Sequence, residues 1–287
     1  MANGKKSKVP ELQLAYHNRK FLESPDARAL RIISEYIEPQ VHFQKAGAVD
    51  TVVFFGSARI LPRNVAVRHL RDVEHRHKNG SKADLRAALK RARMDVHMSR
   101  YYEAARKLAA MITEWAKKTN KPSRSLLVCS GGGPGIMEAA NRGASEAGGK
   151  SVGLNIKLPM EQTPNPYISP ELSMLFRYFF MRKLWFAQPA QALIVFPGGF
   201  GTFDEMFELL TLIQTRKMSR PVTILLYGSK YWKRVIDFGY LVEAGTISSE
   251  DLKLIRFVDS PQQAFDLLKD ELGQRLGLLP AVKHPFV

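Results

Sequence analysis

The spacing of apolar and polar positions changes repeatedly along the chain. Short unbroken apolar runs bounded by glycine, proline or serine predict strands that are buried on both faces of a parallel sheet. We expect strands at 50–59, 150–159, 221–228 and 254–260, and a strand, glycine turn and helix in succession at 125–144 and 192–214. Strands that alternate with helices form a parallel sheet covered on both faces. The pattern predicts a doubly wound α/β fold.

Amphipathic stretches predict the helices. Ser24 as N-cap and Pro25 at the first helical position start a helix over 24–38, whose apolar face holds Leu30, Ile33, Tyr36 and Ile37. We expect further helices at 64–118, with a break at 78–81, and at 171–188, 230–245 and 260–276. The predicted division is an N-terminal arm (1–23) and helix within 1–48, and one domain over 49–287 with a basic helical insertion at about 64–100.

Size and composition fit one large domain. The chain has 287 residues, 45% of them hydrophobic, and a single cysteine, Cys129. No apolar run approaches the roughly 18 residues of a membrane span, and the basic N-terminus has no apolar core of a secretory signal. One cysteine cannot form an intramolecular disulfide, so we expect a cytoplasmic protein.

The chain carries a net charge of +16, which favours anionic partners. Residues 59–107 hold fourteen Lys or Arg against five Asp or Glu. These charges are explained either by solvated helix faces or by nucleic-acid binding, which prefers aromatic side chains that stack on bases. Only Tyr101 and Tyr102 supply aromatics in this span, so nucleic acid is not the expected partner. His75 and His77 lack the spacing of a metal site.

Two glycine-rich turns follow predicted strands. GGGPG (131–135) exposes backbone N–H groups at a helix start, which suits a phosphate, although a tight turn alone would also explain it. It does not match the Gly-x-Gly-x-x-Gly dinucleotide fingerprint, because Ile136 takes the last position. In PGGFGT (197–202), Thr202 either caps the next helix or contacts a phosphate. Two such turns in one sheet favour a shared anion site.

Charged residues accompany these turns. Glu205 has the spacing of a capping box with Thr202, and Asp204 suits the first helical turn, so structural roles are open for both. Arg182 and Lys183 stand within an aromatic helical face. Either both side chains extend along the helix surface to solvent, or the arginine points at an anionic ligand or at a carboxylate. Arg177 could join such a site.

Together these motifs resemble the LONELY GUY family, cytokinin riboside 5′-monophosphate phosphoribohydrolases formerly labelled "possible lysine decarboxylase". The resemblance covers roughly 50–230. It rests on FFGSAR (54–59), GGGPGIME (131–138), MRK (181–183) and PGGFGTFDE (197–205). The N-terminal extension, the basic insertion and Glu138 make the chain look like the longer bacterial members.

The resemblance implies a Rossmann-like fold, a homodimer or higher homo-oligomer, and hydrolysis of the N-glycosidic bond of a nucleoside 5′-monophosphate without metal or other cofactor. It implies that Glu205 stabilises positive charge on the ribose and that Arg182 orients it or assists the leaving base. The implied substrate- and phosphate-binding residues are Gly56, Ser57, Gly132, Gly133, Gly135, Met181, Lys183, Gly198, Gly199, Gly201 and Thr202. A non-catalytic nucleotide sensor and a basic nucleic-acid-binding protein remain as alternatives.

Overall fold

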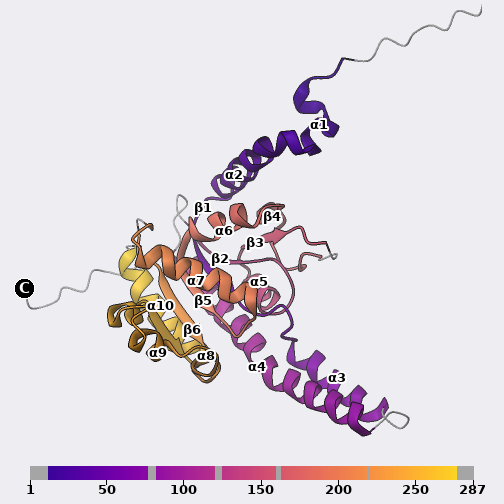
Figure 1. Ribbon diagram of the computed structural model, residues 1–287, viewed down its shortest axis with the longest axis vertical. Helices are drawn as coiled ribbons and strands as arrows, with labels where there is room; N and C mark the ends of the chain where they lie inside the picture. Colours follow the sequence, from indigo (N-terminus) through magenta and orange to yellow (C-terminus); the bar gives the residue numbers. More distant parts are fainter. Residues whose placement is uncertain (1–11, 77–81, 120–124, 160–162, 219, 277–287) are drawn as a thin grey trace, which may run out of the picture.

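One sheet of seven parallel strands forms the centre of the molecule (Figure 1). The computed structural model describes residues 12–76, 82–119, 125–159, 163–218 and 220–276. The strands are β1 (Ala48–Phe55), β2 (Ser125–Ser130), β3 (Ser151–Ile156), β4 (Ser173–Phe176), β5 (Ala190–Val195), β6 (Thr223–Tyr227) and β7 (Ile255–Val258). This confirms the predicted doubly wound, Rossmann-like α/β fold.

The strand order is β4-β3-β2-β1-β5-β6-β7. The chain first builds the sheet outward from β1 to β4, and then returns to place β5 on the other side of β1. Ligands of such sheets bind beyond the carboxyl ends of the strands where this direction reverses. The topology therefore puts the expected site at the ends of β1 and β5, with β2 beside them.

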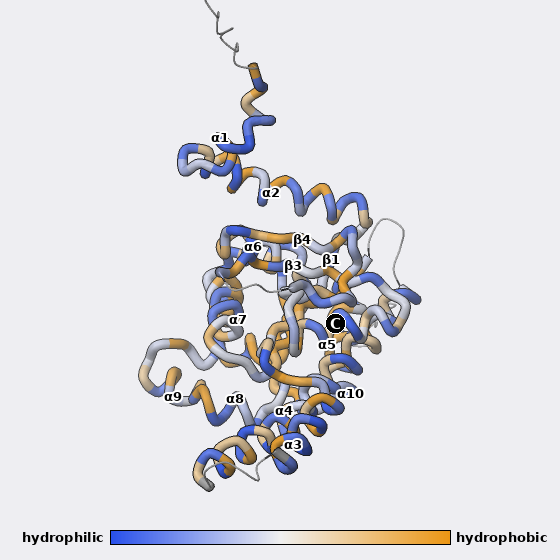
Figure 2. The backbone as a smooth tube through the Cα atoms, turned by 90° about the vertical axis from the view of Figure 1, so that its right-hand side faces the viewer, coloured by the Kyte–Doolittle hydropathy of each residue, from blue (hydrophilic) through white to orange (hydrophobic). Residues whose placement is uncertain are grey.

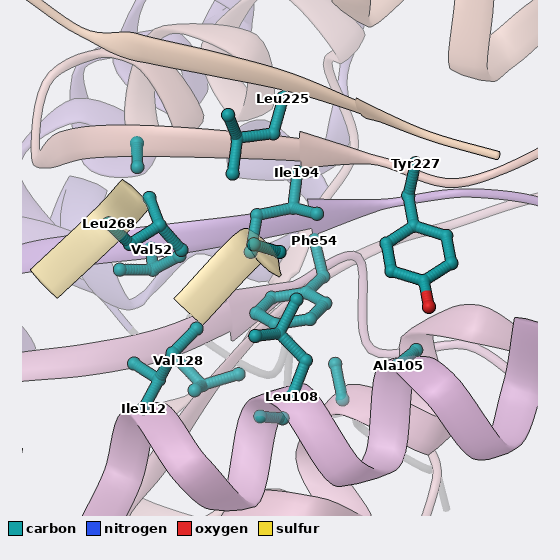
Figure 3. Packing of buried hydrophobic residues seen from close by; sticks show 14 of the residues in the cluster. Val52, Phe54, Ala105, Leu108, Ile112, Val128, Ile194, Leu225, Tyr227 and Leu268 are labelled. Carbon is teal, nitrogen blue, oxygen red and sulfur yellow. The ribbon is translucent and has the colours of Figure 1, made fainter. Parts of the chain in front are cut away.

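Helices cover both faces of the sheet. On one face, α4 (Lys82–Thr119), α5 (Ile136–Glu146) and α10 (Pro261–Arg275) pack over strand residues such as Val52 and Phe54 (Figure 3). On the other face, α6 (Phe179–Ala187), α7 (Phe200–Gln214) and α8 (Ser229–Val235) bury Trp185, Met206 and Trp232. Because both faces are covered, the strands read as continuous apolar runs rather than as alternating ones.

Two predicted helices are wrong in part. The segment 171–188 begins with a short 3₁₀ turn (Pro170–Leu172), continues as the edge strand β4, and becomes helical only at α6. In β4 the side chains alternate, with Met174 and Phe176 buried and Leu175 exposed. The segment 230–245 splits into α8 and α9 (Phe238–Glu243), because Asp237 accepts a hydrogen bond from the Tyr240 N–H and starts a new helix.

The N-terminal helix differs from its prediction in length. A 3₁₀ turn (Pro25–Ala27) leads into α2 (Arg28–Lys45), which continues beyond the predicted end at 38. Ser24 precedes the turn without a capping side-chain hydrogen bond. The predicted apolar face is exposed: Leu30, Ile33, Tyr36 and Ile37 are each 44–52% accessible. With α1 (Arg19–Glu23), α2 extends away from the sheet (Figures 1 and 2). Residues 1–11 of the predicted arm lie outside the described residues.

The basic segment forms a helical hairpin of α3 (Arg63–Arg76) and the first half of α4, which projects from the sheet on the side opposite α2 (Figure 1). The predicted break at 78–81 lies outside the described residues. Among the helices that the structure describes, none has the length and apolarity needed to cross a membrane. The cytoplasmic location and the division into an N-terminal part and one domain stay predictions.

Candidate functional site

Three turns meet at the carboxyl ends of β1, β2 and β5. The Ser57 N–H donates to the carbonyl of Pro197 at 3.0 Å, and the Ile136 N–H donates to the carbonyl of Ser57 at 3.2 Å. A Cβ on Gly56 would lie 2.8 Å from the Ile136 side chain, and a Cβ on Gly135, whose φ is +70°, would lie 2.4 Å from the Ser57 carbonyl oxygen. Glycine is therefore needed at both positions for the turns to approach so closely.

Buried asparagines hold the GGGPG turn. The Asn165 side chain donates to the carbonyls of Gly132 (3.0 Å) and Gly133 (3.1 Å) and to Asn141 Oδ1 (3.0 Å). The Gly132 N–H donates to Ser130 Oγ at 3.1 Å, so this predicted phosphate donor already has an acceptor. Sequence reasoning missed Asn141 and Asn165. The one local signal was an asparagine on the otherwise apolar buried face of α5.

The PGGFGT turn is open where the first turn of α7 begins. The N-cap is Gly199, no side chain caps the helix, and Thr202 is the third helical residue. Of the alternatives that the sequence left open, a cap at Thr202 and its capping box with Glu205 are therefore excluded. The N–H groups of the first helical turn have no intrahelical acceptors. Added Cβ atoms on Gly199 or Gly201 would meet nothing within 4 Å, whereas Gly198 lies against Thr202.

A buried ion pair lies between α6 and α7. Arg182 Nη2 is 3.0 Å from Glu205 Oε1, and the Arg182 side chain is 9% exposed against 17% for Glu205. The guanidinium lies 5.0 Å from the Phe186 ring centroid. A Cβ on Gly131 would come within 2.8 Å of Nη2, so the pair also lies directly beside the GGGPG turn. Arg182 Nε is buried and has no hydrogen-bond partner among the described residues.

Burial controls the charge states of this pair. Desolvation raises the pKa of Glu205 to about 7, against the opposing attraction of Arg182. Desolvation also lowers the pKa of Arg182, an effect that Glu205 counteracts. Burial also raises the pKa of the Cys129 thiol, which senses the charges of both Arg182 and Glu205 and stays protonated. A carboxyl with a pKa near 7 can change its protonation state at neutral pH, which is a property of many catalytic acids and bases.

The raised pKa makes a stability prediction. Folded Glu205 binds its proton more tightly than an unfolded glutamate does, because its pKa is about 7 against a reference of 4.5. Its stabilising contribution is therefore present below about pH 4.5 and is lost as the pH rises through 7. We expect the unfolding free energy of the native chain, relative to Glu205→Gln, to fall by on the order of 2–3 kcal/mol between pH 5 and 8 in urea titrations. Parallel pH profiles for the two proteins would contradict the shifted pKa.

The other predicted charged residues lie outside this pair. Lys183 Nζ pairs with Asp204 (2.8 Å) and Glu208 (2.9 Å) on the outer side of α6 and α7. Asp204 therefore belongs to an interhelical ion pair, and its predicted place in the first helical turn is wrong. Met181 is buried in the core. The backbone N–H of Arg177 donates to Glu35 on α2, so Arg177 anchors the N-terminal helix instead of joining the pair.

The fold and this site define a Rossmann-like α/β protein in which three turns meet at the strand ends and a buried Arg–Glu pair lies beside the GGGPG turn, next to an uncapped helix start. The family described as "Possible lysine decarboxylase" matches residues 137–268. This match and the relatives below confirm the resemblance to the LONELY GUY family.

Two curated relatives share one type of name. The cytokinin riboside 5′-monophosphate phosphoribohydrolase LOG2 of Arabidopsis thaliana is 26% identical over 173 residues, covering 59% of this chain and 76% of the relative. The probable cytokinin riboside 5′-monophosphate phosphoribohydrolase LOGL5 of Oryza sativa subsp. japonica is 30% identical over 131 residues, covering 45% and 52%. The chain thus spans about half the length of the rice relative.

Solved structures show a more distant likeness. The molybdenum cofactor binding protein of the phototrophic bacterium Rippkaea orientalis matches at 19% identity with a TM-score of 0.41, covering 60% of this chain and 88% of that chain. The Moco carrier protein of Chlamydomonas reinhardtii matches at 18% identity with a TM-score of 0.41, covering 61% and 89%.

Proposed function

We propose that this protein hydrolyses the N-glycosidic bond of a nucleoside 5′-monophosphate, of the AMP or cytokinin riboside monophosphate type, to a free base and ribose 5-phosphate. The observation that carries the proposal is the buried Arg182–Glu205 pair beside the uncapped start of α7. The phosphoribohydrolase names of the Arabidopsis and rice relatives support the same reaction class.

The 5′-phosphate is assigned to the PGGFGT turn. The first-turn N–H groups of α7 and the helix dipole favour a phosphate there. Gly199 and Gly201 are exposed and leave room for it. The GGGPG turn mainly shapes the site and does not offer these N–H groups to the phosphate. The Gly132 N–H already donates to Ser130, and the Ile136 N–H at the start of α5 donates to Ser57. Gly56, Gly135 and Gly198 permit the close packing of the turns.

Glu205 is the residue assigned to the chemistry. Breaking the glycosidic bond develops positive charge on the ribose, which a nearby carboxylate stabilises. In the ionised form, Glu205 also accepts a proton from the attacking water, so that the water oxygen bonds to C1′ while the C1′–N bond breaks and the base leaves with its electron pair. A pKa near 7 allows Glu205 to accept this proton and to pass it, directly or through water, to the departing base, which becomes the neutral free base.

Arg182 is assigned to positioning and charge stabilisation. One nitrogen, Nη2, holds Glu205, while the buried Nε has no partner among the described residues and can donate to a substrate oxygen or to the leaving base. Burial strengthens both interactions, because the surroundings of the pair screen charge less than water does. Met181 and Lys183 act indirectly, through the packing of α6 and its ion pairs with α7.

The test of the proposed function is base release from AMP by the purified protein, followed by chromatography. Adenosine, which lacks the phosphate, serves as the matched control. Remote phosphate binding helps to position the reacting bond, so we expect kcat/KM for adenosine to be lower by about 10²-fold or more. Cytokinin riboside monophosphate and the other nucleoside monophosphates identify the preferred base.

The outcomes separate the alternatives. Release from AMP but not from adenosine supports the proposal. AMP binding without release from any of the monophosphates would make the protein a nucleotide sensor instead. The resemblance also implies a homodimer or higher homo-oligomer, which stays a prediction. The exposed apolar side chains on α2 and α6 are compatible with such an assembly.

A further inference from the structure

A basic groove lies between α3, α4 and α5, apart from the Arg182–Glu205 pair. Its volume is about 710 Å³, within the usual size range of small-ligand sites. Five arginines from the three helices converge on it, together with a single acid. The lining residues are Arg63, Asn64, Val67, Arg68, Arg71, Glu103, Arg106 and Arg142.

Two of these arginines are held in place. Arg106 makes a two-pronged ion pair with Glu146, at 2.5 Å from Nε and 2.7 Å from Nη2, and Arg142 Nε binds the same carboxylate at 2.9 Å. Their side chains are 34% and 27% exposed, so each guanidinium is partly shielded from water. The shared Glu146 therefore fixes two neighbouring guanidinium groups in advance, which lowers the cost of ordering them around a ligand.

The other three arginines are exposed on α3. The side chains of Arg63, Arg68 and Arg71 have no ion pair with any residue that the structure describes. Glu103 accepts the backbone N–H of Arg63 at 3.0 Å and lies 3.6 Å from Arg106. With Glu103 and Glu146 counted against the five arginines, the groove keeps three uncompensated positive charges.

We propose that this groove binds a small ligand that carries two or more linked phosphates. A single phosphate ester has a charge of only about −1.5 to −2 at pH 7, too little to balance the groove. Arginine forks match phosphate oxygens in geometry as well as in charge. A single-stranded nucleic acid fits less well, because Tyr101 and Tyr102, the aromatic residues of this basic span, are buried and cannot stack on bases.

The groove is separate from the proposed nucleotide site. Arg142 lies six residues into α5, about 10 Å along the helix from the GGGPG turn. The phosphate of the proposed substrate is assigned to α7, which lies on the other face of the sheet. A ligand in the groove would thus bind at the same time as a nucleoside monophosphate, and its binding does not depend on the proposed catalysis.

The test measures binding of inorganic tripolyphosphate, pyrophosphate and phosphate by calorimetry, with saturating ribose 5-phosphate, the product that is not consumed, present to occupy the phosphate position of the nucleotide site. The variant Arg68→Gln/Arg71→Gln removes two exposed charges from the groove. Arg86→Gln/Arg93→Gln is the matched control, because it removes two exposed charges from the same hairpin outside the groove. We expect saturable tripolyphosphate binding that weakens by about tenfold or more in the first variant only.

Several results would overturn the proposal. Equal weakening in both variants would mean diffuse attraction to the basic hairpin, and inorganic phosphate binding as tightly as tripolyphosphate would mean a simple anion site. The absence of saturable binding would mean no site. A duplex oligonucleotide that binds more tightly than tripolyphosphate, and that both variants weaken, would identify a nucleic-acid surface instead. Circular dichroism and AMP turnover confirm that both variants are folded.

Discussion

Replacing Glu205 by glutamine is expected to lower kcat for AMP by about 10²-fold or more while nucleotide binding persists. Glutamine preserves the size of the side chain and can still accept a hydrogen bond from Arg182, which binds Oε1 at 3.0 Å. It removes the negative charge that would stabilise the developing charge on the ribose, and it cannot accept a proton from water. The loss should therefore appear in kcat, measured as base release, with little change in the Kd for AMP from calorimetry.

Glu208→Gln is the matched control. Glu208 lies one turn further along α7 and pairs with Lys183 on the outer side, so the same chemical change there leaves the buried pair intact. We expect its kcat to stay within about twofold of the native value, because this ion pair is partly exposed to water and contributes little. If Glu205→Gln turned over AMP as fast as Glu208→Gln, Glu205 would have no part in the chemistry.

Replacing Arg182 by methionine is expected to reduce both activity and stability. Methionine fills much of the same volume but leaves the Glu205 carboxylate buried without its partner, which in proteins costs roughly 3–5 kcal/mol when the acid remains ionised. Glu205 avoids part of this cost by taking up a proton, since Arg182 is the attraction that opposes its desolvation. We expect kcat/KM for AMP to fall by about 10²-fold or more, and the pH at which activity reaches half its maximum to move upward.

The upward shift separates a role at the site from simple loss of packing. A variant that only loosened α6 would lose stability without moving the pH profile of the remaining activity. Arg177→Met is the control, because Arg177 is exposed and its backbone, rather than its side chain, binds Glu35. An unshifted profile in Arg182→Met, with stability reduced, would leave Arg182 a structural role only.

Local sequence patterns predicted most of the fold, because a strand that is buried on both faces is apolar along most of its length. This holds for β1, β2, β5 and β6, whose residues are almost all buried. The pattern failed at β4, an edge strand of four residues. Its alternation of buried and exposed side chains is too short to distinguish from the helix that follows it at Phe179.

The motifs and the family resemblance also indicated Arg182 and Glu205 as site residues, but not that they form a buried pair or what surrounds them. Nothing local distinguishes Arg182 from Lys183, although the first is buried against Glu205 and the second lies outside with Asp204 and Glu208. One step along a helix rotates a side chain by about 100°, so the choice depends on which face α6 turns toward α7. Asn165 was not foreseen because it reaches the GGGPG turn from a distant loop.

The sequence by itself determined the parallel α/β architecture and the glycine turns at the strand ends, because periodicity and glycine conformations act within a few residues. Only the tertiary structure decided that these turns meet, that Thr202 is not a cap, that the apolar face of α2 is exposed, and that arginines from α3, α4 and α5 share one groove. Those features depend on strand order and on helix orientation, which join residues far apart in the chain.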